Sequence, residues 1–357
     1  MKKSLLSVLL VASMTAACSF SSPSDSSAGE DTDSASQPII SGKASDSSQD
    51  SVVLLVHTQD QSHFSVCTGT LVASNLVLTA RHCLSVTSDG AFGCDDKGNL
   101  SPGSKGGNVG ADYRPGDISV YTGAVRPDVE KGGPQVVPAN AMGKKIFHDT
   151  GKVICSHDLG LLQLDRELPQ AKITPIRLDS SVKKGEKFTA IGWGVTLDAG
   201  FPKQRQARTG IVVTEVGPYA GSKTEDPVPP NDFQVGEATC QGDSGGPAFS
   251  EVTGAVIGVV SRGGNGADDS SGPSAGCIKA SNDYTQTSPF KSLILQTFQA
   301  VGREPRIEEP INPGSSGGES KSGCSVGAAG SSSTPAGAGA MVALGIALAA
   351  IRRRRHG

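Results

Sequence analysis

Short runs of apolar and β-branched residues recur through the middle of the chain, and turn-forming residues separate them. The runs are Val52–His57, Val66–Val72, Leu76–Ala80, Ile118–Thr122, Leu159–Leu164, Lys187–Ile191, Thr209–Val216 and Ala255–Ser261. Runs of this length, bounded by Gly, Pro, Asn and Asp, are typical of strands, and many of them together predict a barrel or a sandwich. The stretch Val86–Gly116 is rich in Gly, Asp and Ser, and we expect an inserted loop there.

One helical pattern follows the strands. Apolar residues at helical spacing occupy one face; they are Phe290, Leu293, Ile294, Phe298 and Val301. Ser288 and Pro289 are suited to the cap and the first position of a helix, and Gly302 is suited to its end. The pattern therefore predicts an all-β domain over residues 39–302 that closes with a single helix.

The N-terminal residues predict export. Lys2 and Lys3 precede the short apolar run Leu5–Ala12, and small residues then lead to Cys18, so residues 1–18 form a predicted signal peptide. The segment resembles a bacterial lipoprotein signal, and this resemblance implies that Cys18 is lipidated. Ordinary signal-peptide cleavage without lipidation is the alternative. Residues 19–38 are Ser/Asp-rich with almost no large apolar residue, which predicts a disordered pro-segment or tether.

The C-terminal residues predict anchoring. A Pro/Gly/Ser linker over residues 303–323 leads to a segment, 324–357, with Cys324, the 16-residue apolar run Ala336–Ile351 and the basic cluster Arg352–Arg355. The run is shorter than the roughly 20 residues that span a bilayer. The segment resembles the C-terminal sorting signals of Gram-negative bacteria of the myxobacterial type; a permanent tail anchor is the alternative. We expect an outer-membrane or cell-surface protein, or a released one, that meets export and sorting machinery.

Composition narrows the class further. The net charge is −3 with no basic surface signal, which argues against a nucleic-acid partner, and the 46 glycines suit a turn-rich β fold. Eight cysteines are present, and no two of them have CxxC spacing, so we do not expect a zinc site. In an exported protein such cysteines are expected to form disulfides. No cofactor or metal is expected. The acidic stretch 94–99 is more typical of a solvated turn than of a calcium site.

Three short segments carry chemistry. The sequence CQGDSGGPAF (240–249) places Ser244 between tight glycine turns, where a hydroxyl is exposed and a carbonyl can approach backbone N–H groups. A serine nucleophile needs a base, and that base needs an orienting carboxylate. LTARHC (78–83) supplies His82, and HDLGLLQL (157–164) supplies Asp158 at the head of an apolar strand.

These segments, in the order His82, Asp158, Ser244, resemble the trypsin/chymotrypsin family of serine proteases. The resemblance covers roughly residues 39–301. It implies two six-stranded antiparallel β-barrels and a secreted endopeptidase that acts on proteins or peptides. It also implies His82 as base, Asp158 as its orienter, Ser244 as nucleophile, and the N–H groups of Gly242 and Ser244 as the oxyanion hole.

The resemblance implies an activation step and a set of disulfides. In the family, a buried ion pair forms between the residue equivalent to Asp243 and a new N-terminus, here that of Ile39; Pro38 before it is not a trypsin-like cleavage site. The expected disulfides are two family pairs, Cys67–Cys83 and Cys240–Cys277, and the remaining pair Cys94–Cys155.

The same resemblance implies the substrate-binding residues, which are Ala238, Ser261, Arg262, Gly263 and Asn282. Ala238 stands where trypsins have the aspartate that selects Lys or Arg, so we expect cleavage after neutral or apolar residues. Arg262 replaces the family's Trp and is expected to favour acidic residues further along the substrate. Asp283 would restore a basic preference if it, and not Asn282, faced the pocket.

Two other classes compete with the enzyme. A catalytically inactive protease homologue could act as a surface binding module, but every triad residue and the oxyanion glycine are present. A surface structural protein or adhesin would explain the terminal signals and leave the three segments unexplained.

Overall fold

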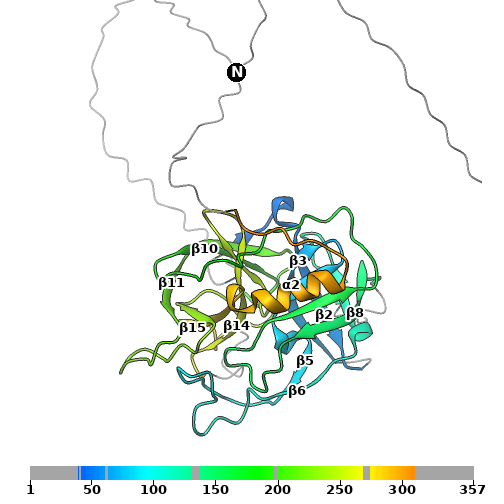
Figure 1. Ribbon diagram of the computed structural model, residues 1–357. Coiled ribbons are helices and arrows are strands. Elements are labelled where there is room, and N and C mark those ends of the chain that lie inside the picture. The colour runs from blue at the N-terminus through cyan, green and yellow to red at the C-terminus, as the bar shows by residue number, and fades with distance from the viewer. Residues whose placement is uncertain are drawn as a thin grey trace, which may run out of the picture. The chain divides into compact units, whose positions relative to one another are not determined.

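The computed structural model describes residues 39, 42–60, 63–129, 137–196, 200–267 and 274–309. The predicted signal peptide, tether and sorting segment, with Cys18 and Cys324, lie outside these residues. Figure 1 shows two adjoining β-barrels and one C-terminal helix. Three short 3₁₀ turns, η1 (Ser47–Gln49), η2 (Arg81–Cys83) and η3 (Pro115–Asp117), lie between strands of the first half.

The first barrel is a closed antiparallel ring of six strands in the order β2-β3-β4-β9-β8-β7. The strands are β2 (Val52–Thr58), β3 (Phe64–Ala73), β4 (Leu76–Thr79), β7 (Ile118–Tyr121), β8 (Ala141–His148) and β9 (Gly160–Leu164). Their apolar residues pack into an interior that includes Val53, Leu55, Val77 and Leu162, all at most 1% exposed. β-branched and aliphatic runs pack well on such a pleated surface, which is why these segments form strands.

The second barrel repeats this architecture. The strands β10 (Lys187–Gly192), β11 (Gln206–Val216), β12 (Asp232–Val235), β13 (Pro247–Ser250), β14 (Val256–Gly264) and β15 (Ser281–Gln286) run in the order β11-β10-β13-β14-β15-β12. Pairing of β11 with β12 closes the ring, and the two-residue β1 (Lys43–Ala44) adds to β11. At its centre Phe233 stacks on Tyr284, and Phe188 contacts both rings edge-on. The expected fold of two six-stranded antiparallel barrels is confirmed.

The predicted inserted loop has its own framework. β5 (Ser85–Thr87) and β6 (Val109–Asp112) pair at its base as a two-stranded sheet. Its tip is joined to the body by the Cys94–Cys155 disulfide, which closes a sequence separation of 61 residues. The insertion is therefore fastened a few residues before the start of β9.

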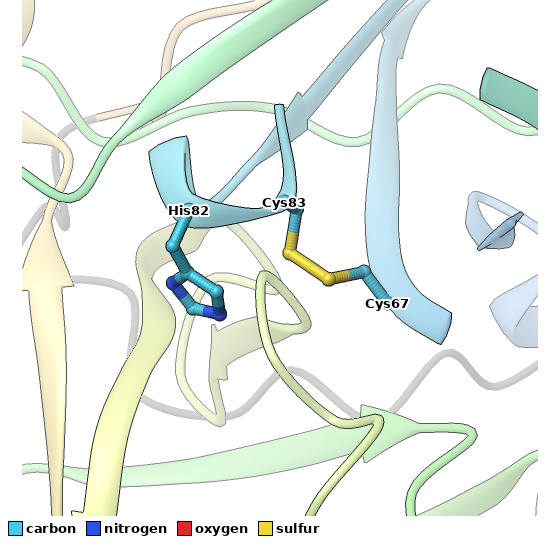
Figure 2. A group of neighbouring side chains, drawn as sticks. All are labelled: Cys67, His82 and Cys83. Atoms are coloured by element: carbon cyan, nitrogen blue, oxygen red, sulfur yellow. A yellow bond between two sulfur atoms is a disulfide. The ribbon is translucent and has the colours of Figure 1, made fainter. Parts of the chain in front are cut away.

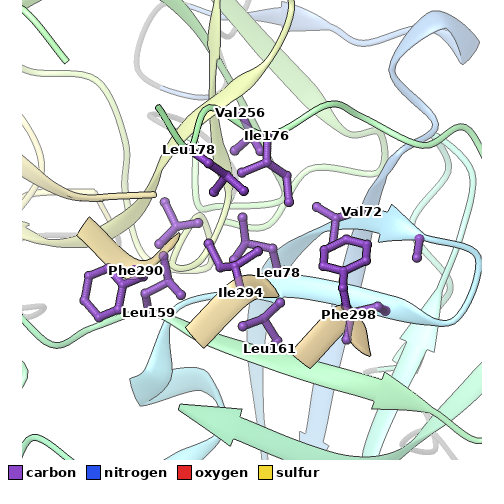
Figure 3. Close-up of a cluster of buried hydrophobic side chains, with 13 residues drawn as sticks. Val72, Leu78, Leu159, Leu161, Ile176, Leu178, Val256, Phe290, Ile294 and Phe298 are labelled. Carbon is purple, nitrogen blue, oxygen red and sulfur yellow. The ribbon is translucent and has the colours of Figure 1, made fainter. Parts of the chain in front are cut away.

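The predicted helix is present but begins differently. A 3₁₀ turn, η6 (Ser288–Phe290), precedes α2 (Lys291–Ala300). At the start of each element, no side chain makes a capping hydrogen bond to the backbone, so the expected capping role of Ser288 is wrong. Gly302 has φ +68° and follows the helix end, as expected. Figure 3 shows Phe290, Ile294 and Phe298 packed among Leu78, Leu159, Leu161, Ile176 and Val256. Each such burial contributes about 1.5–3 kcal/mol, and together they connect the helix to both barrels.

The packed domain continues past the predicted boundary at residue 302. Ile176 forms a bridge with Ile307, and the buried Arg177 guanidinium pairs with Glu308 at 2.6 Å and with Glu186 at 2.7 Å. Residues up to Glu308 therefore belong to the folded body. Of the helices among the described residues, α2 included, none is long and apolar enough to cross a membrane.

Candidate active site

Strand register brings His82 and Asp158 together. His82 lies in η2, which begins two residues after the end of β4, and Asp158 lies two residues before the start of β9. β4 and β9 pair so that Thr79 faces Gly160, and the two chain segments therefore meet at one end of the first barrel. Asp158 Oδ2 accepts from His82 Nδ1 at 2.8 Å, and Asp158 Oδ1 accepts from the His82 backbone N–H at 2.9 Å. This double contact fixes the orientation of the imidazole.

Burial and charge act in opposite directions on this pair. Burial alone lowers the pKa of His82, but the charge of Asp158 and its hydrogen bond overcome that effect and raise the pKa above its ordinary value. Burial would raise the pKa of Asp158, yet His82 and a 2.7 Å hydrogen bond from Ser261 Oγ hold it below its ordinary value. Asp158 is fully buried and stays ionised, so His82 Nε2 is left to exchange a proton with a third group.

The Ser244 loop is held between the barrels by Thr68 of β3. The Thr68 N–H donates to Ser244 O at 2.8 Å, and Thr68 Oγ1 donates to Gly242 O at 2.9 Å. Gly245 has φ +76°, and a Cβ on it would lie 1.9 Å from Thr79 Oγ1, so only glycine fits there. Ser244 itself is partly exposed and lines the cleft described below.

Two backbone N–H groups lie free beside Ser244. Gly242 has φ +97°, and neither its N–H nor that of Ser244 donates to another of the described residues. Such paired donors can bind an oxygen that gains negative charge.

Asp243 lies beneath this loop as a buried carboxylate. It is 1% exposed and accepts from Gly194 N at 2.7 Å and Cys240 N at 2.9 Å. Burial raises its pKa to about 7, because the two N–H groups offset only part of the desolvation and no described cation pairs with it. Ile39 is also fully buried.

A cleft of about 630 Å³ runs past Ser244. The end of β14, Ser261–Gly264, lines one wall, and residues 90–94 of the inserted loop line another. Thr239 and Asn282 also line it, whereas Ala238 is fully buried behind them.

Asn282 and Asp283 face opposite sides of β15, as neighbouring strand residues do. Asn282 Oδ1 accepts from Ala238 N at 2.8 Å and Thr239 N at 2.9 Å, which places Asn282 at the predicted pocket. Asp283 instead accepts from Gln234 at 3.3 Å and pairs with Arg262. Both residues line the cleft, but the Asp283 carboxyl is held by Arg262 and Gln234 and not by the N–H groups of Ala238 and Thr239.

Arg262 does not offer a free positive charge to substrate. Its guanidinium pairs with Asp232 at 2.7 Å and Asp283 at 3.3 Å, and its side chain is 12% exposed. The expectation that it attracts acidic substrate residues is not supported, because its guanidinium is already held by two carboxyl groups. Asp232 is fully buried, and burial raises its pKa to about 7.

Three disulfides join Cys67 to Cys83, Cys94 to Cys155, and Cys240 to Cys277, the same pairs that the sequence analysis expects. Figure 2 shows His82 beside the first of them. The sulfurs of Cys67 and Cys83 lie near the imidazole, but a disulfide supplies no thiolate, so only His82 of this group could bind a metal. In the acidic stretch, Asp95 accepts from the N–H groups of Lys97 and Asn99, which is the arrangement of a simple turn.

Sequence reasoning did not identify Thr68, Asp149 or Asp232. Thr68 lies in an ordinary strand segment next to Cys67, and Asp149 and Asp232 stand in turn-like segments. Adjacency to Cys67 was the one available signal for Thr68. The partners of the two aspartates are distant in sequence, so no local pattern marks them.

Comparisons with known proteins agree with this geometry. The trypsin family profile matches residues 39–285. Human kallikrein-8 is 31% identical over 210 residues, covering 56% of this chain and 66% of kallikrein-8. A trypsin of Phaedon cochleariae is 26% identical (43% and 62% covered), and dog anionic trypsin is 28% identical (51% and 72% covered). The chain thus spans just under two thirds of the first two relatives. Human heparin binding protein shares the fold, with a TM-score of 0.50 at 20% identity over 75% of this chain and all of that one.

Proposed function

Because this chain belongs to the trypsin family, we propose that it is a secreted serine endopeptidase that uses His82, Asp158 and Ser244. The observation that carries the proposal is the double hydrogen bond from His82 to the buried Asp158. Ser261, which lines the same cleft as Ser244, also donates to Asp158. An imidazole oriented in this way is what a serine hydroxyl needs to become a nucleophile.

The proposed chemistry follows from these groups. Ser244 Oγ attacks the peptide carbonyl while His82 Nε2 takes its proton, and Asp158 stabilises the imidazolium. The oxyanion accepts from the N–H groups of Gly242 and Ser244. His82 then gives the proton to the leaving amine, and the C–N bond breaks to leave an acyl-enzyme. Water then attacks the ester carbonyl while His82 Nε2 takes a proton from it. The C–O bond to Ser244 breaks, His82 returns the proton to Ser244 Oγ, and the acid is released.

We propose cleavage after neutral or apolar residues. Ala238 brings no carboxylate, and the Asp283 carboxylate is bound to Arg262 and Gln234. Burying a substrate ammonium without a partner would cost several kcal/mol (about 2–7 for even a neutral polar group). Ser261, Arg262 and Gly263 would supply the strand edge against which the substrate backbone lies.

Activation by cleavage before Ile39 is also part of the proposal. Asp243 is a buried acid with no described cation beside it, and a new α-amino group would supply that partner. Removing one member of such a buried pair would cost about 3–5 kcal/mol. Export, and retention at the surface through Cys18 or Cys324, is proposed from the terminal sequences alone.

Covalent labelling tests the enzymatic proposal. Processed wild-type protein should react with a fluorophosphonate probe and cleave members of a mixed peptide pool, whereas the matched Ser244→Ala variant should do neither. Sequencing the N-terminus of the labelled form tests cleavage before Ile39. A wild-type protein that neither labels nor cleaves would instead support the inactive homologue that acts as a binding module.

A further inference from the structure

A carboxylate outside the triad connects the two segments that carry His82 and Asp158. Asp149 follows β8 and accepts from Arg81 Nη1 at 3.3 Å through Oδ1, and from His157 Nδ1 at 2.5 Å through Oδ2. Arg81 immediately precedes His82, and His157 immediately precedes Asp158. One side chain therefore touches the neighbours of both.

This cluster is closely fitted. The Arg81 side chain is 3% exposed, and its Nη1 also donates to Gly151 O at 2.6 Å. Asp149 Oδ1 accepts from the Gly151 N–H at 3.0 Å. A Cβ on Gly151 would fall 2.4 Å from His157 Cγ, so the turn has no room for a larger residue. Such packing allows little independent movement of the two segments.

We propose that Asp149 is a positioning residue that holds Arg81 and His157 in one ion-paired cluster and so sets the geometry and charge environment of the His82–Asp158 pair. The proposal rests on the proposed protease function. Asp149 does not touch substrate and is not a catalytic residue.

The charge of Arg81 gives Asp149 a role beyond tethering. His82 must become an imidazolium during catalysis, and an uncompensated guanidinium on the preceding residue would oppose that change. Asp149 neutralises this charge, and its own pKa is held below the ordinary value in spite of burial by the His157 hydrogen bond and by Arg81. Three other charged or titratable groups face this region. His157 has a pKa that its hydrogen bond to Asp149 raises, Asp232 acts on His157, and the Arg262 guanidinium acts on Asp158.

The fold does not depend on Asp149 alone, so its removal can be tested. The same segment is held by the Cys94–Cys155 disulfide and by Asn231 Nδ2, which donates to Ser156 O at 3.1 Å. Asp165 offers a matched control in the same barrel. Like Asp149, it accepts from a backbone N–H, that of Met142, and from an arginine, Arg166. The side chain of Asp165 is 33% exposed and that of Asp149 is 26% exposed, but Asp165 lies away from the site.

The experiment compares Asp149→Asn with Asp165→Asn in the full-length, processed protein. We expect Asp149→Asn to lower kcat about 10-fold with KM unchanged, since a 1 Å misplacement can cost about 100-fold. The acid limb of its kcat/KM profile should move to lower pH, because the uncompensated Arg81 charge lowers the pKa of His82. Asp165→Asn should match wild type in kcat and in the pH of the acid limb.

A second variant separates charge from structure. Adding Arg81→Met to Asp149→Asn removes the uncompensated cation, so the pKa of His82 should return toward the wild-type value. An NMR titration of the His82 ring in the Ser244→Ala background measures this without turnover, and it also serves if Asp149→Asn proves too unstable for kinetics.

The outcomes distinguish the two proposals. If wild type neither labels nor cleaves, the protease function fails, while the NMR titration still tests Asp149. If wild type is active but Asp149→Asn keeps its kcat and the pKa of His82, the role of Asp149 is overturned. A loss of kcat equal to that of Asp165→Asn would likewise overturn it.

Discussion

The uncleaved chain should become less stable as pH rises toward 7, because of Asp243. Its pKa is raised from 3.8 to about 7 by burial, so the folded state holds a proton that the unfolded state releases. For an acid shifted in this direction, stability is fully present below pH 3.8 and is lost as pH rises to about 7. Three pKa units correspond to about 4 kcal/mol, at about 1.4 kcal/mol per unit.

Asp243→Asn isolates this effect. The amide does not titrate, but its NH₂ group faces a backbone N–H, that of Cys240 or Gly194, so one hydrogen bond is lost at a cost of about 1–3 kcal/mol. The variant should therefore be less stable than its parent at pH 4.5 and equal or more stable at pH 7.5. Comparing the two chains cancels contributions from groups that both contain, Asp232 among them.

Urea unfolding provides the measurement. Both chains carry Ser244→Ala to prevent self-cleavage and are studied uncleaved from pH 4.5 to 7.5. The difference in unfolding free energy should change by several kcal/mol over this range, with the variant gaining. A difference that stays constant within about 1 kcal/mol would refute the unpaired buried carboxylate. In a chain cleaved before Ile39, an ion pair with the new α-amino group should reverse the order at pH 7.5.

Three further results are expected. The base must be neutral to act, so the raised pKa of His82 implies that kcat/KM increases with pH through an ionisation above 6.5. An acid limb of the kcat/KM profile at or below pH 6.5 would contradict the Asp158 contact. Asn282→Gly should open the pocket beside Ala238 and raise the ratio of kcat/KM for Phe over Ala substrates about 10-fold, and an unchanged ratio would exclude Asn282 from the pocket. The double variant Cys94→Ser/Cys155→Ser should lose about 4 kcal/mol of stability in urea unfolding, as a 61-residue loop predicts, and a loss under 1 kcal/mol would show that the insertion is held by other contacts.

The features of this protein that depend on local segments follow from the sequence. Strands such as β2, β9 and β14 were predicted because their apolar runs have no competing pattern, and His82, Asp158 and Ser244 were identified because each lies in a local segment suited to its chemistry. Strand β15 was not predicted, since SNDYTQ is polar. Asn282, Asp283 and Thr285 find their partners only at residues 238–239, 262 and 232 of the folded barrel.

Which charged side chains pair with one another was decided by tertiary structure alone. Arg262 looked available to substrate until barrel closure placed Asp232 and Asp283 against it, and Asp149 looked like a turn residue until β8 and β9 brought it between Arg81 and His157. The physical reason is that local sequence sets backbone preference and burial pattern. The strength and direction of an electrostatic interaction, in contrast, depend on distances between residues that only strand register and barrel closure determine.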